Sequence, residues 1–315
     1  MPRLAIAAAL LAASLAAAAQ APTAPPAPAS PQPSVAESLT MRAAARLQQG
    51  DLRGALADAN AALARDSRNS GAYALRGTIR MTSGDRAGAL LDMNRAIELA
   101  GDVKGIEIVF ANRANLHWLE GRSREAAADI AASLHRNPDF ALALNVRARL
   151  KADQGDLDGA LVDLDRAIKL EPKMMPAYQA RATVNLQAGR LQESLSDLKT
   201  LMWSLPNDAD VVASHGIVRG LVGETGPAID DLLKAGRMNR ISISDKARGA
   251  ASSPAGRLDQ YREMNPNDAR AQLMRGVVSI MNGEVERGLK EVDRAVQLDP
   301  TLAADAELVR GRIKR

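Results

Sequence analysis

Gly155-Asp156-Leu157-Asp158-Gly159-Ala160-Leu161 is one of several similar stretches in this chain, each led by a glycine and a polar residue. Such a pair suits the left-handed end of one helix and the acidic first turn of the next. The leading glycines are spaced by 34, 37, 34, 34, 34 and 60 residues. They are Gly50, Gly84, Gly121, Gly155, Gly189, Gly223 and Gly283. This period predicts an array of two-helix repeats.

Small residues and prolines keep fixed offsets from these glycines. Seven residues before each glycine stand Ala43, Gly77, Ala114, Ala148, Ala182, Gly216 and Gly276. Twelve after it stand Ala62, Ala96, Ser133, Ala167, Leu201, Ala235 and Ala295. Seventeen after it, Pro138, Pro172, Pro206 and Pro300 end the second helix. Two helices that approach closely need small residues where their axes cross, so each repeat is expected to be an antiparallel helix pair.

The combined pattern resembles the tetratricopeptide repeat family over about residues 37–300. The resemblance implies an all-α, right-handed solenoid of antiparallel helix pairs, with about seven repeats and a capping helix at 301–315. A degenerate repeat is expected near 235–268, where Gly249 and Pro254 belong to a helix-breaking cluster, and this repeat should form a bend or weak point. The family's usual tyrosine, four residues before the glycine, is absent, which we expect to loosen contacts between repeats. Arg46, Arg80, His117, Lys151, Asn185, Arg219 and Ser279 occupy that position.

Composition agrees with a thin helical array. Of the 315 residues 46% are apolar, yet only 2% are aromatic, so the core must consist mainly of alanine and leucine. The net charge of +4 comes from interspersed charges and does not form a nucleic-acid-binding patch. The chain has no cysteine, which excludes disulfides, thiolate metal sites and cysteine nucleophiles.

The N-terminus predicts export. Residues 1–19 combine a basic start, an uncharged apolar run and small residues before Gln20, as in a signal peptide cleaved there. An uncleaved membrane anchor is the alternative, although the run is short for a span. Residues 20–36 are rich in proline and alanine and predict an extended linker. We therefore expect a periplasmic or secreted protein.

Oppositely charged residues also recur with the repeat. A basic residue stands eight positions before most of the glycines and an acidic residue eight positions after them. One interpretation is a ladder of arginines that binds an anionic partner; the favoured one is a structural arginine–carboxylate pair between neighbouring helices. The spacing leaves open whether the pairs form within or between repeats. The predicted pairs are Arg76 and Asp92, Arg113 and Asp129, Arg147 and Asp163, and Arg181 and Asp197.

The resemblance also implies a concave groove lined by the first helices, with a mixed apolar and polar character suited to a peptide or helix. Trp118 is either an anchor for a partner or a residue covered by the adjacent helix. Trp203, late in a second helix, is expected to be structural. The candidate groove residues are Ile108, Asn115, Trp118, Leu119, Leu142, Asn145, Arg149, Gln179, Thr183 and Leu186.

No catalytic pattern accompanies the repeats. His117, His135 and His215 occupy different repeat offsets, and no phosphate loop or nucleophile elbow occurs. The sequence therefore predicts a non-catalytic scaffold without cofactor or metal, which binds a protein or peptide partner of unknown identity. Nucleic acid and small-molecule substrates are not expected, and membrane contact should occur only through partners. The alternative is an assembly component that oligomerises through its ends or its convex face.

Overall fold

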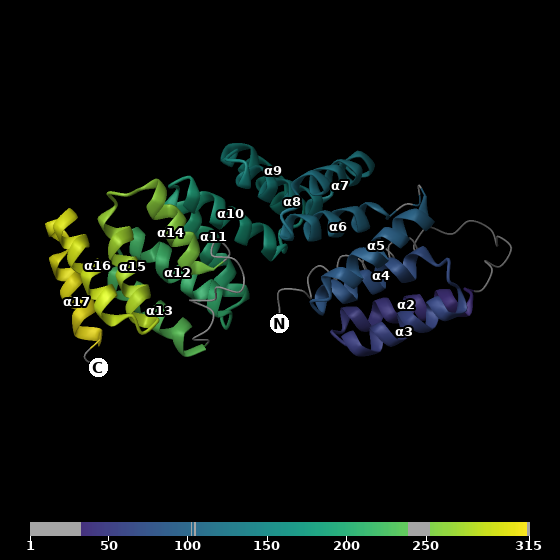
Figure 1. Cartoon of the computed structure of the whole chain (residues 1–315), viewed down its shortest axis with the longest axis horizontal. Coiled ribbons are helices and arrows are strands. Elements are labelled where there is room, and N and C mark those ends of the chain that lie inside the picture. The colour runs from purple at the N-terminus through teal and green to yellow at the C-terminus, as the bar shows by residue number, and fades with distance from the viewer. Residues whose placement is uncertain (1–32, 102, 104, 239–252, 314–315) are drawn as a thin grey trace, which may run out of the picture. The chain divides into compact units, whose positions relative to one another are not determined.

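The computed structural model describes residues 33–101, 103, 105–238 and 253–313, and every regular element among them is helical. The expected signal peptide, most of the expected linker and residues 239–252 of the degenerate repeat lie outside the described residues. The first helices of the repeats are α2 (Val35–Gln48), α4 (Ser70–Thr82), α6 (Glu107–Leu119), α8 (Ala141–Asp153), α10 (Met175–Gln187), α12 (Ala209–Leu221) and α15 (Ala269–Met281). The second helices are α3 (Leu52–Arg65), α5 (Arg86–Ala100), α7 (Ser123–Arg136), α9 (Leu157–Leu170), α11 (Leu191–Ser204), α13 (Thr225–Met238) and α16 (Val285–Leu298). The prediction of an all-α helical array is confirmed (Figure 1).

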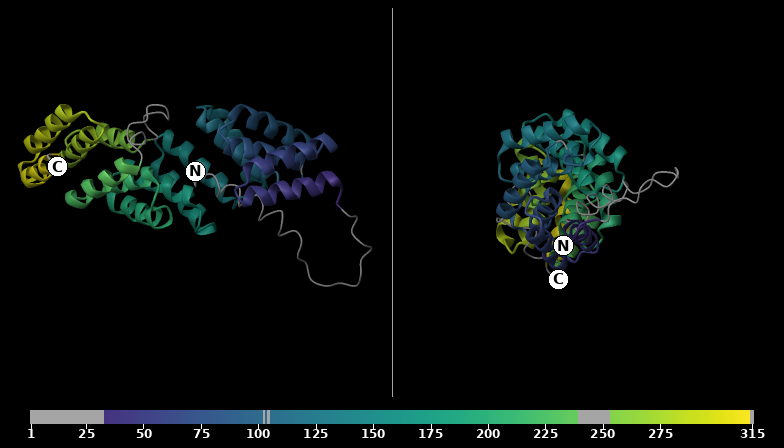
Figure 2. Two further views of the ribbon diagram at one scale, coloured as in Figure 1. Left: turned by 90° about the horizontal axis from the view of Figure 1, so that it is seen from below. Right: turned by 90° about the vertical axis from the view of Figure 1, so that its right-hand side faces the viewer.

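The chain divides into two compact units. The first comprises the residues up to Gln154 together with Arg166–Met174, and the second comprises Gly155–Asp165 and Met175–Arg315. Helix α9 contributes residues to both. Within each unit a first helix contacts the second helix that follows it, as α2 contacts α3 and α12 contacts α13 (Figure 2). Helix α2 begins at Val35, inside the segment expected to be linker.

Each repeat turns at the glycine that the sequence pattern picks out. All seven glycines of the series have a positive φ, between 71° and 101°, which side chains with a Cβ rarely adopt. In three repeats the next helix begins at a capping carboxylate. The side chains of Asp51, Asp85 and Asp156 each accept a hydrogen bond from the backbone N–H three residues later. In these repeats the glycine therefore ends the first helix and the aspartate after it caps the second.

Small residues allow the two helices of a repeat to approach closely. A Cβ on Gly276 would lie 2.8 Å from the carbonyl oxygen of Gly288 and 2.8 Å from Cγ2 of Val292. Ala55 and Ala62, at the corresponding close approach of another repeat, have no exposed surface. The crossing of α15 and α16 thus depends on the absence of a side chain at Gly276.

A buried carboxylate on the second helix binds an arginine on the first helix of the same repeat. Arg76 donates two hydrogen bonds to Asp92, from Nε at 2.9 Å and from Nη2 at 2.7 Å, and Arg80 Nη1 donates a third at 2.7 Å. Asp92 is only 3% exposed. The same two-pronged contact joins Arg42 to Asp58, Arg113 to Asp129 and Arg181 to Asp197.

The same arginines also reach the preceding repeat. Arg76 Nη1 donates to Asn60 Oδ1 at 2.9 Å, and Arg113 Nη1 donates to Asn94 Oδ1 at 2.7 Å. In the second unit Arg181 Nη1 donates to Asp165 Oδ1 at 2.6 Å. One guanidinium therefore fixes the helix pair inside its repeat and also ties that repeat to the one before.

Arg147 and Asp163, the fourth predicted pair, fall on opposite sides of the boundary between the two units. Their pairing stays a prediction.

The residues that replace the family's tyrosine strengthen this contact in several repeats. Arg46 Nη1 lies 2.7 Å from Asp58 Oδ2, and Arg80 and Arg219 make the same kind of contact with the aspartate of their own repeats. These side chains add contacts to a buried carboxylate of their own repeat and so stabilise its helix pair. Looser contacts between repeats stay a prediction.

Helix α14, the described helix of the degenerate repeat, is placed differently from a regular second helix. Helix α15 contacts both α12 and α13, just as α4 contacts both α2 and α3. The stack therefore continues directly from the α12–α13 pair to α15. Helix α14 (Pro254–Met264) instead contacts three first helices, α10, α12 and α15. In Figure 1 it lies alongside α12.

The C-terminal segment begins with a short 3-10 helix, Pro300–Leu302, and continues as α17 (Ala303–Ile313). Asp299 caps the start of this 3-10 helix, because the Asp299 side chain accepts a hydrogen bond from the Thr301 backbone N–H at 3.0 Å. Helix α17 contacts α13, α15 and α16, burying Ala306 and Val309.

We predict that Asp58→Asn lowers the free energy of unfolding by about 1–2 kcal/mol at neutral pH, the order expected for hydrogen bonds to a charged group. Hydrogen bonding from Arg42, against the opposing effect of burial, lowers the pKa of Asp58 below its ordinary 3.8. The carboxylate therefore stabilises the fold above pH 3.8, and this contribution is lost as the pH falls through the lowered pKa.

Urea unfolding of the wild type and the variant from pH 7 to pH 2 measures this difference. Glu98→Gln is the matched control, because Glu98 pairs with Arg95 on the exposed surface and should change stability little. A difference for Asp58→Asn that persists unchanged at the lowest pH would contradict the assignment.

Candidate protein-binding faces

The candidate groove residues of the first unit lie on α6 and α8, and they differ in exposure. Ile108 is 6% exposed and belongs to an apolar cluster with Leu75 and Ile79. Asn115 is partly buried, whereas Leu119 is 43% exposed. The end of α6 therefore presents an apolar side chain to solvent, while its start is part of the core.

Trp118 connects α6 to α8. Its indole Nε1–H donates a hydrogen bond to Asp153 Oδ2 at 2.6 Å, and its ring lies 5.1 Å from the guanidinium carbon of Arg149. Leu142 packs against the same apolar cluster as Trp118. Of the two interpretations of Trp118, this geometry favours the one in which the adjacent helix covers it, and the tryptophan positions Arg149.

Arg149 differs from the arginines of the repeated pairs because no carboxylate among the described residues lies within ion-pair distance of it. Burial lowers its pKa to about 10, while the charge of Asp153 acts in the opposite direction. The guanidinium therefore remains protonated at neutral pH. Its contact with the Trp118 ring occupies the π face and leaves N–H donors for a further acceptor.

Asn145 stands one helical turn before Arg149 on α8. It is 2% exposed, and its side-chain oxygen is buried without a hydrogen-bond partner among the described residues. Buried acceptors of this kind are rare in folded proteins. Two polar side chains on this stretch of α8 thus have unused hydrogen-bonding capacity.

The candidate groove residues of the second unit are covered by the chain itself. Gln179, Thr183 and Leu186 on α10 line a cavity of about 20 Å³ that is closed in part by Pro254 and Arg257 of α14. This volume holds about one water molecule. These three residues are therefore placed together, but α14 already lies over them.

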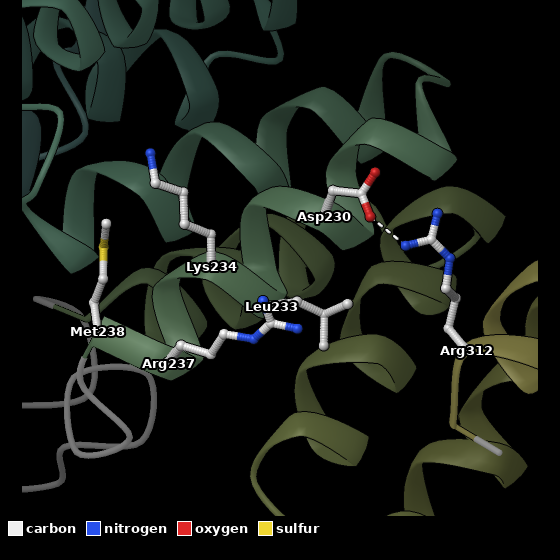
Figure 3. A pocket seen from close by; sticks show the side chains of 6 residues that line it. All are labelled: Asp230, Leu233, Lys234, Arg237, Met238 and Arg312. Carbon is white, nitrogen blue, oxygen red and sulfur yellow. Dashed lines mark hydrogen bonds and ion pairs between the residues drawn. The ribbon is translucent and has the colours of Figure 1, made fainter. Parts of the chain in front are cut away.

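A larger cavity of about 380 Å³ lies between α13 and α17, away from the predicted groove. Figure 3 shows Arg312 reaching across to Asp230, with Lys234 and Arg237 along the same side of α13. Asp230, Lys234 and Arg237 are exposed, so this cavity is an open surface depression with mixed charge.

Trp203 is not the structural residue that we expected. Its side chain is 90% exposed near the end of α11. The expectation failed because the repeat pattern fixes only the buried positions of a second helix, and Trp203 lies outside them.

The described part of the chain does not bring together side chains that could hold a metal ion. No cluster of three histidines or carboxylates with metal-binding geometry occurs there. His117 and His215 both contact the aspartate of their own repeats, so these histidines belong to the charge pairs. The helices of this part are also too short or too polar to span a membrane.

A sequence profile described as tetratricopeptide repeat matches residues 112–174, 146–199 and 255–303. These stretches are tetratricopeptide repeats. The third match includes α14, which this repeat protein uses outside the regular stack.

Curated relatives resemble parts of this repeat protein. Protein FlbA of Caulobacter vibrioides is 29% identical over 109 residues, which is 33% of this chain and 18% of that protein. DnaJ homolog subfamily C member 3 of Rattus norvegicus is 28% identical over 183 residues, which is 56% of this chain and 33% of that protein. The chain thus spans a third or less of the length of these relatives.

Solved structures share the fold at low identity. A tetratricopeptide repeat protein from Parabacteroides merdae has a TM-score of 0.50 and 20% identity, covering 88% of this chain and 99% of that one. The structure of Cut9 with Hcn1 has a TM-score of 0.62 and 14% identity, covering 76% of this chain and 44% of that one. PilW, a type IV pilus biogenesis factor, has a TM-score of 0.52 and 19% identity, covering 69% of this chain and 97% of that one.

Tryptophan fluorescence tests the two environments. We predict that Trp203→Phe, which leaves Trp118, gives a blue-shifted emission that iodide quenches weakly, because the Trp118 ring is partly buried against Arg149. Trp118→Phe, which leaves the exposed Trp203, should give a red-shifted and readily quenched emission. Equal quenching of the two variants would contradict the Trp118 contacts.

Proposed function

We propose that the protein is a non-catalytic scaffold that binds a segment of a protein partner on the first-helix face of its N-terminal unit. Arg149 carries this proposal, because it is a protonated guanidinium on a first helix whose described contact is an aromatic ring. A carboxylate of the partner would complete its hydrogen bonds. Leu119 follows Trp118 on α6, is 43% exposed and offers an apolar contact.

The remaining charges of the array support the same choice. Arg76, Arg113 and Arg181 use their donors on carboxylates and amides of the array, so they are occupied by the scaffold. The tetratricopeptide repeats add support, since tetratricopeptide repeat proteins are typically interaction scaffolds, and Cut9 shares the fold and occurs in a hetero-tetramer with Hcn1. The partner segment should combine an acidic residue with an apolar one.

We also propose that the protein works outside the cytoplasm, in the cell envelope or beyond it. The basic start and apolar run of residues 1–19 support this proposal. N-terminal sequencing of the protein purified from its host is the test, and we predict that the mature chain begins at Gln20. A chain that keeps residues 1–19 and fractionates with the cytoplasm would contradict export.

Affinity capture from extracts of the host, with the purified full chain as bait, tests the binding face. We predict that Arg149→Glu loses the proteins captured by the wild type, because the reversed charge repels the partner's carboxylate. Arg166→Glu is the matched control: Arg166 pairs with Asp139 on the exposed side of a second helix, so capture should be unchanged. Equal loss in both variants would contradict a specific role for Arg149.

The exposed indole of Trp203 favours a second candidate function, assembly through the convex side. An exposed aromatic side chain is a common anchor in protein interfaces. The same capture experiment with Trp203→Ala, together with sedimentation of the purified chain, distinguishes the two. If Trp203→Ala abolishes capture or self-association while Arg149→Glu does not, the assembly function is supported.

A further inference from the structure

Helix α14 occupies the first-helix face of the C-terminal unit. A second helix normally contacts the first helix of its own repeat and that of the next, yet α14 reaches α10, α12 and α15. Figure 1 shows it against α12, within the same unit as its other contacts. The helix therefore lies across the surface on which the resemblance places a ligand.

Two apolar side chains anchor α14 to this face. Leu258 has no exposed surface and Tyr261 is 5% exposed, and both belong to one apolar cluster with Leu186, Ile217 and Val218. Leu258 and Tyr261 are three residues apart, so they lie on the same side of the helix. This spacing is typical of a helix bound in a groove.

Polar contacts hold both sides of the helix. Arg257 Nη2 donates a hydrogen bond to Ser214 Oγ on α12 at 2.7 Å. Asp259 Oδ1 lies 2.7 Å from Arg275 Nε on α15, and Arg262 Nη2 donates to Gln272 Oε1 on the same helix at 2.7 Å. Each contact joins a side chain of α14 to a first helix, so the orientation of α14 on the face is specified.

The fit between α14 and the face is close. The cavity of about 20 Å³ that Gln179, Thr183 and Leu186 share with Pro254 and Arg257 has room for about one water molecule. No second segment can enter there while α14 is bound.

Helix α14 depends on its contacts with the first-helix face for its stability. It has 11 residues, begins with Pro254 and contains Gly256. A helix of this length is marginal by itself in water, and a glycine lowers its propensity further. The contacts with α10, α12 and α15 therefore hold α14 in its helical form, as binding holds a peptide ligand.

We propose that the first-helix face of α10 and α12 is a groove for an amphipathic helix, that α14 is its resident occupant, and that a partner helix binds there only by displacing α14. The competing helix would present an apolar pair at the spacing of Leu258 and Tyr261, with a basic residue next to the first. This groove belongs to the other unit from Arg149, so either proposal can fail without the other.

Fluorescence anisotropy with a labelled synthetic peptide of residues 253–268 tests the proposal on the full chain. The wild type should bind this peptide weakly, because the tethered α14 competes at a high effective concentration. We predict that the double variant Arg257→Ala/Leu258→Ala binds it at least about tenfold more tightly, since its own helix is held less firmly. A peptide with alanine in place of Leu258 and Tyr261 should not bind.

Leu302→Ala is the matched control for lost core packing. Leu302 is also buried, at 1% exposure, but its 3-10 helix contacts α16 and α17. This variant should bind the peptide as weakly as the wild type. Equal affinity in the wild type and the double variant, or an equal gain with Leu302→Ala, would overturn the proposal.

A chemical cross-link gives an independent answer should the double variant fold poorly. The chain has no cysteine, so Ser214→Cys/Arg257→Cys places two unique thiols on α12 and α14. A short bis-maleimide should link them within one molecule, and the linked protein should lose the peptide binding that the unlinked protein retains. No intramolecular link, or binding that the link does not reduce, would contradict the resident position of α14.

Discussion

A carboxylate buried on the second helix constrains the geometry of a repeat. Asp58, Asp92, Asp129 and Asp197 are 3–5% exposed, and a charge at such a site is costly unless it is paired and hydrogen-bonded. The bidentate arginine contact pairs this carboxylate only if the first and second helices of the repeat lie in one fixed register. The constraint matters here because aromatic residues make up 2% of the chain, so bulky side chains are scarce for fixing that register. A third N–H of the same guanidinium then binds the preceding repeat, as when Arg76 donates a hydrogen bond to Asn60, and so helps to fix the position of that repeat.

Features that depend on residues at a fixed sequence distance could be predicted from the sequence. The arginine and aspartate of a pair are always 16 residues apart, and the turn glycine always adopts a positive φ, so one repeat explains the others. Contacts made by a residue at which one repeat departs from the pattern could not be predicted. Arg80 stands where the family has a tyrosine, and no repeated offset in the sequence indicates that its Nη1 donates a hydrogen bond to Asp92. Likewise, no pattern at Trp118 shows that its ring contacts Arg149.

The charge pairs also separate the arginines that hold the fold together from Arg149, the one proposed to bind a partner. Arg76 and Arg113 each bind a buried carboxylate of their own repeat and an amide of the preceding one, whereas Arg149 keeps N–H donors next to the ring of Trp118. The sequence placed both kinds of arginine on first helices and could not rank them. The difference lies in the acceptor: Asp92 stands opposite Arg76, whereas no described carboxylate stands within ion-pair distance of Arg149.

The position of α14 follows from the same packing rules that build the array. In the regular repeats a small residue usually stands twelve positions after the glycine, where the two helices cross closely; in the degenerate repeat Tyr261 stands there, and Arg257 replaces the acidic residue of the charge pair. A tyrosine at that crossing would force the helices apart, and the charge pair cannot form because Ile241 and Arg257 stand at its two positions. Yet Leu258 and Tyr261 still form an apolar side that must be buried. The first-helix face of α10 and α12 offers the apolar surface, and Ser214 offers the acceptor for Arg257. A second helix that cannot form its own repeat can therefore serve as a ligand for its neighbours.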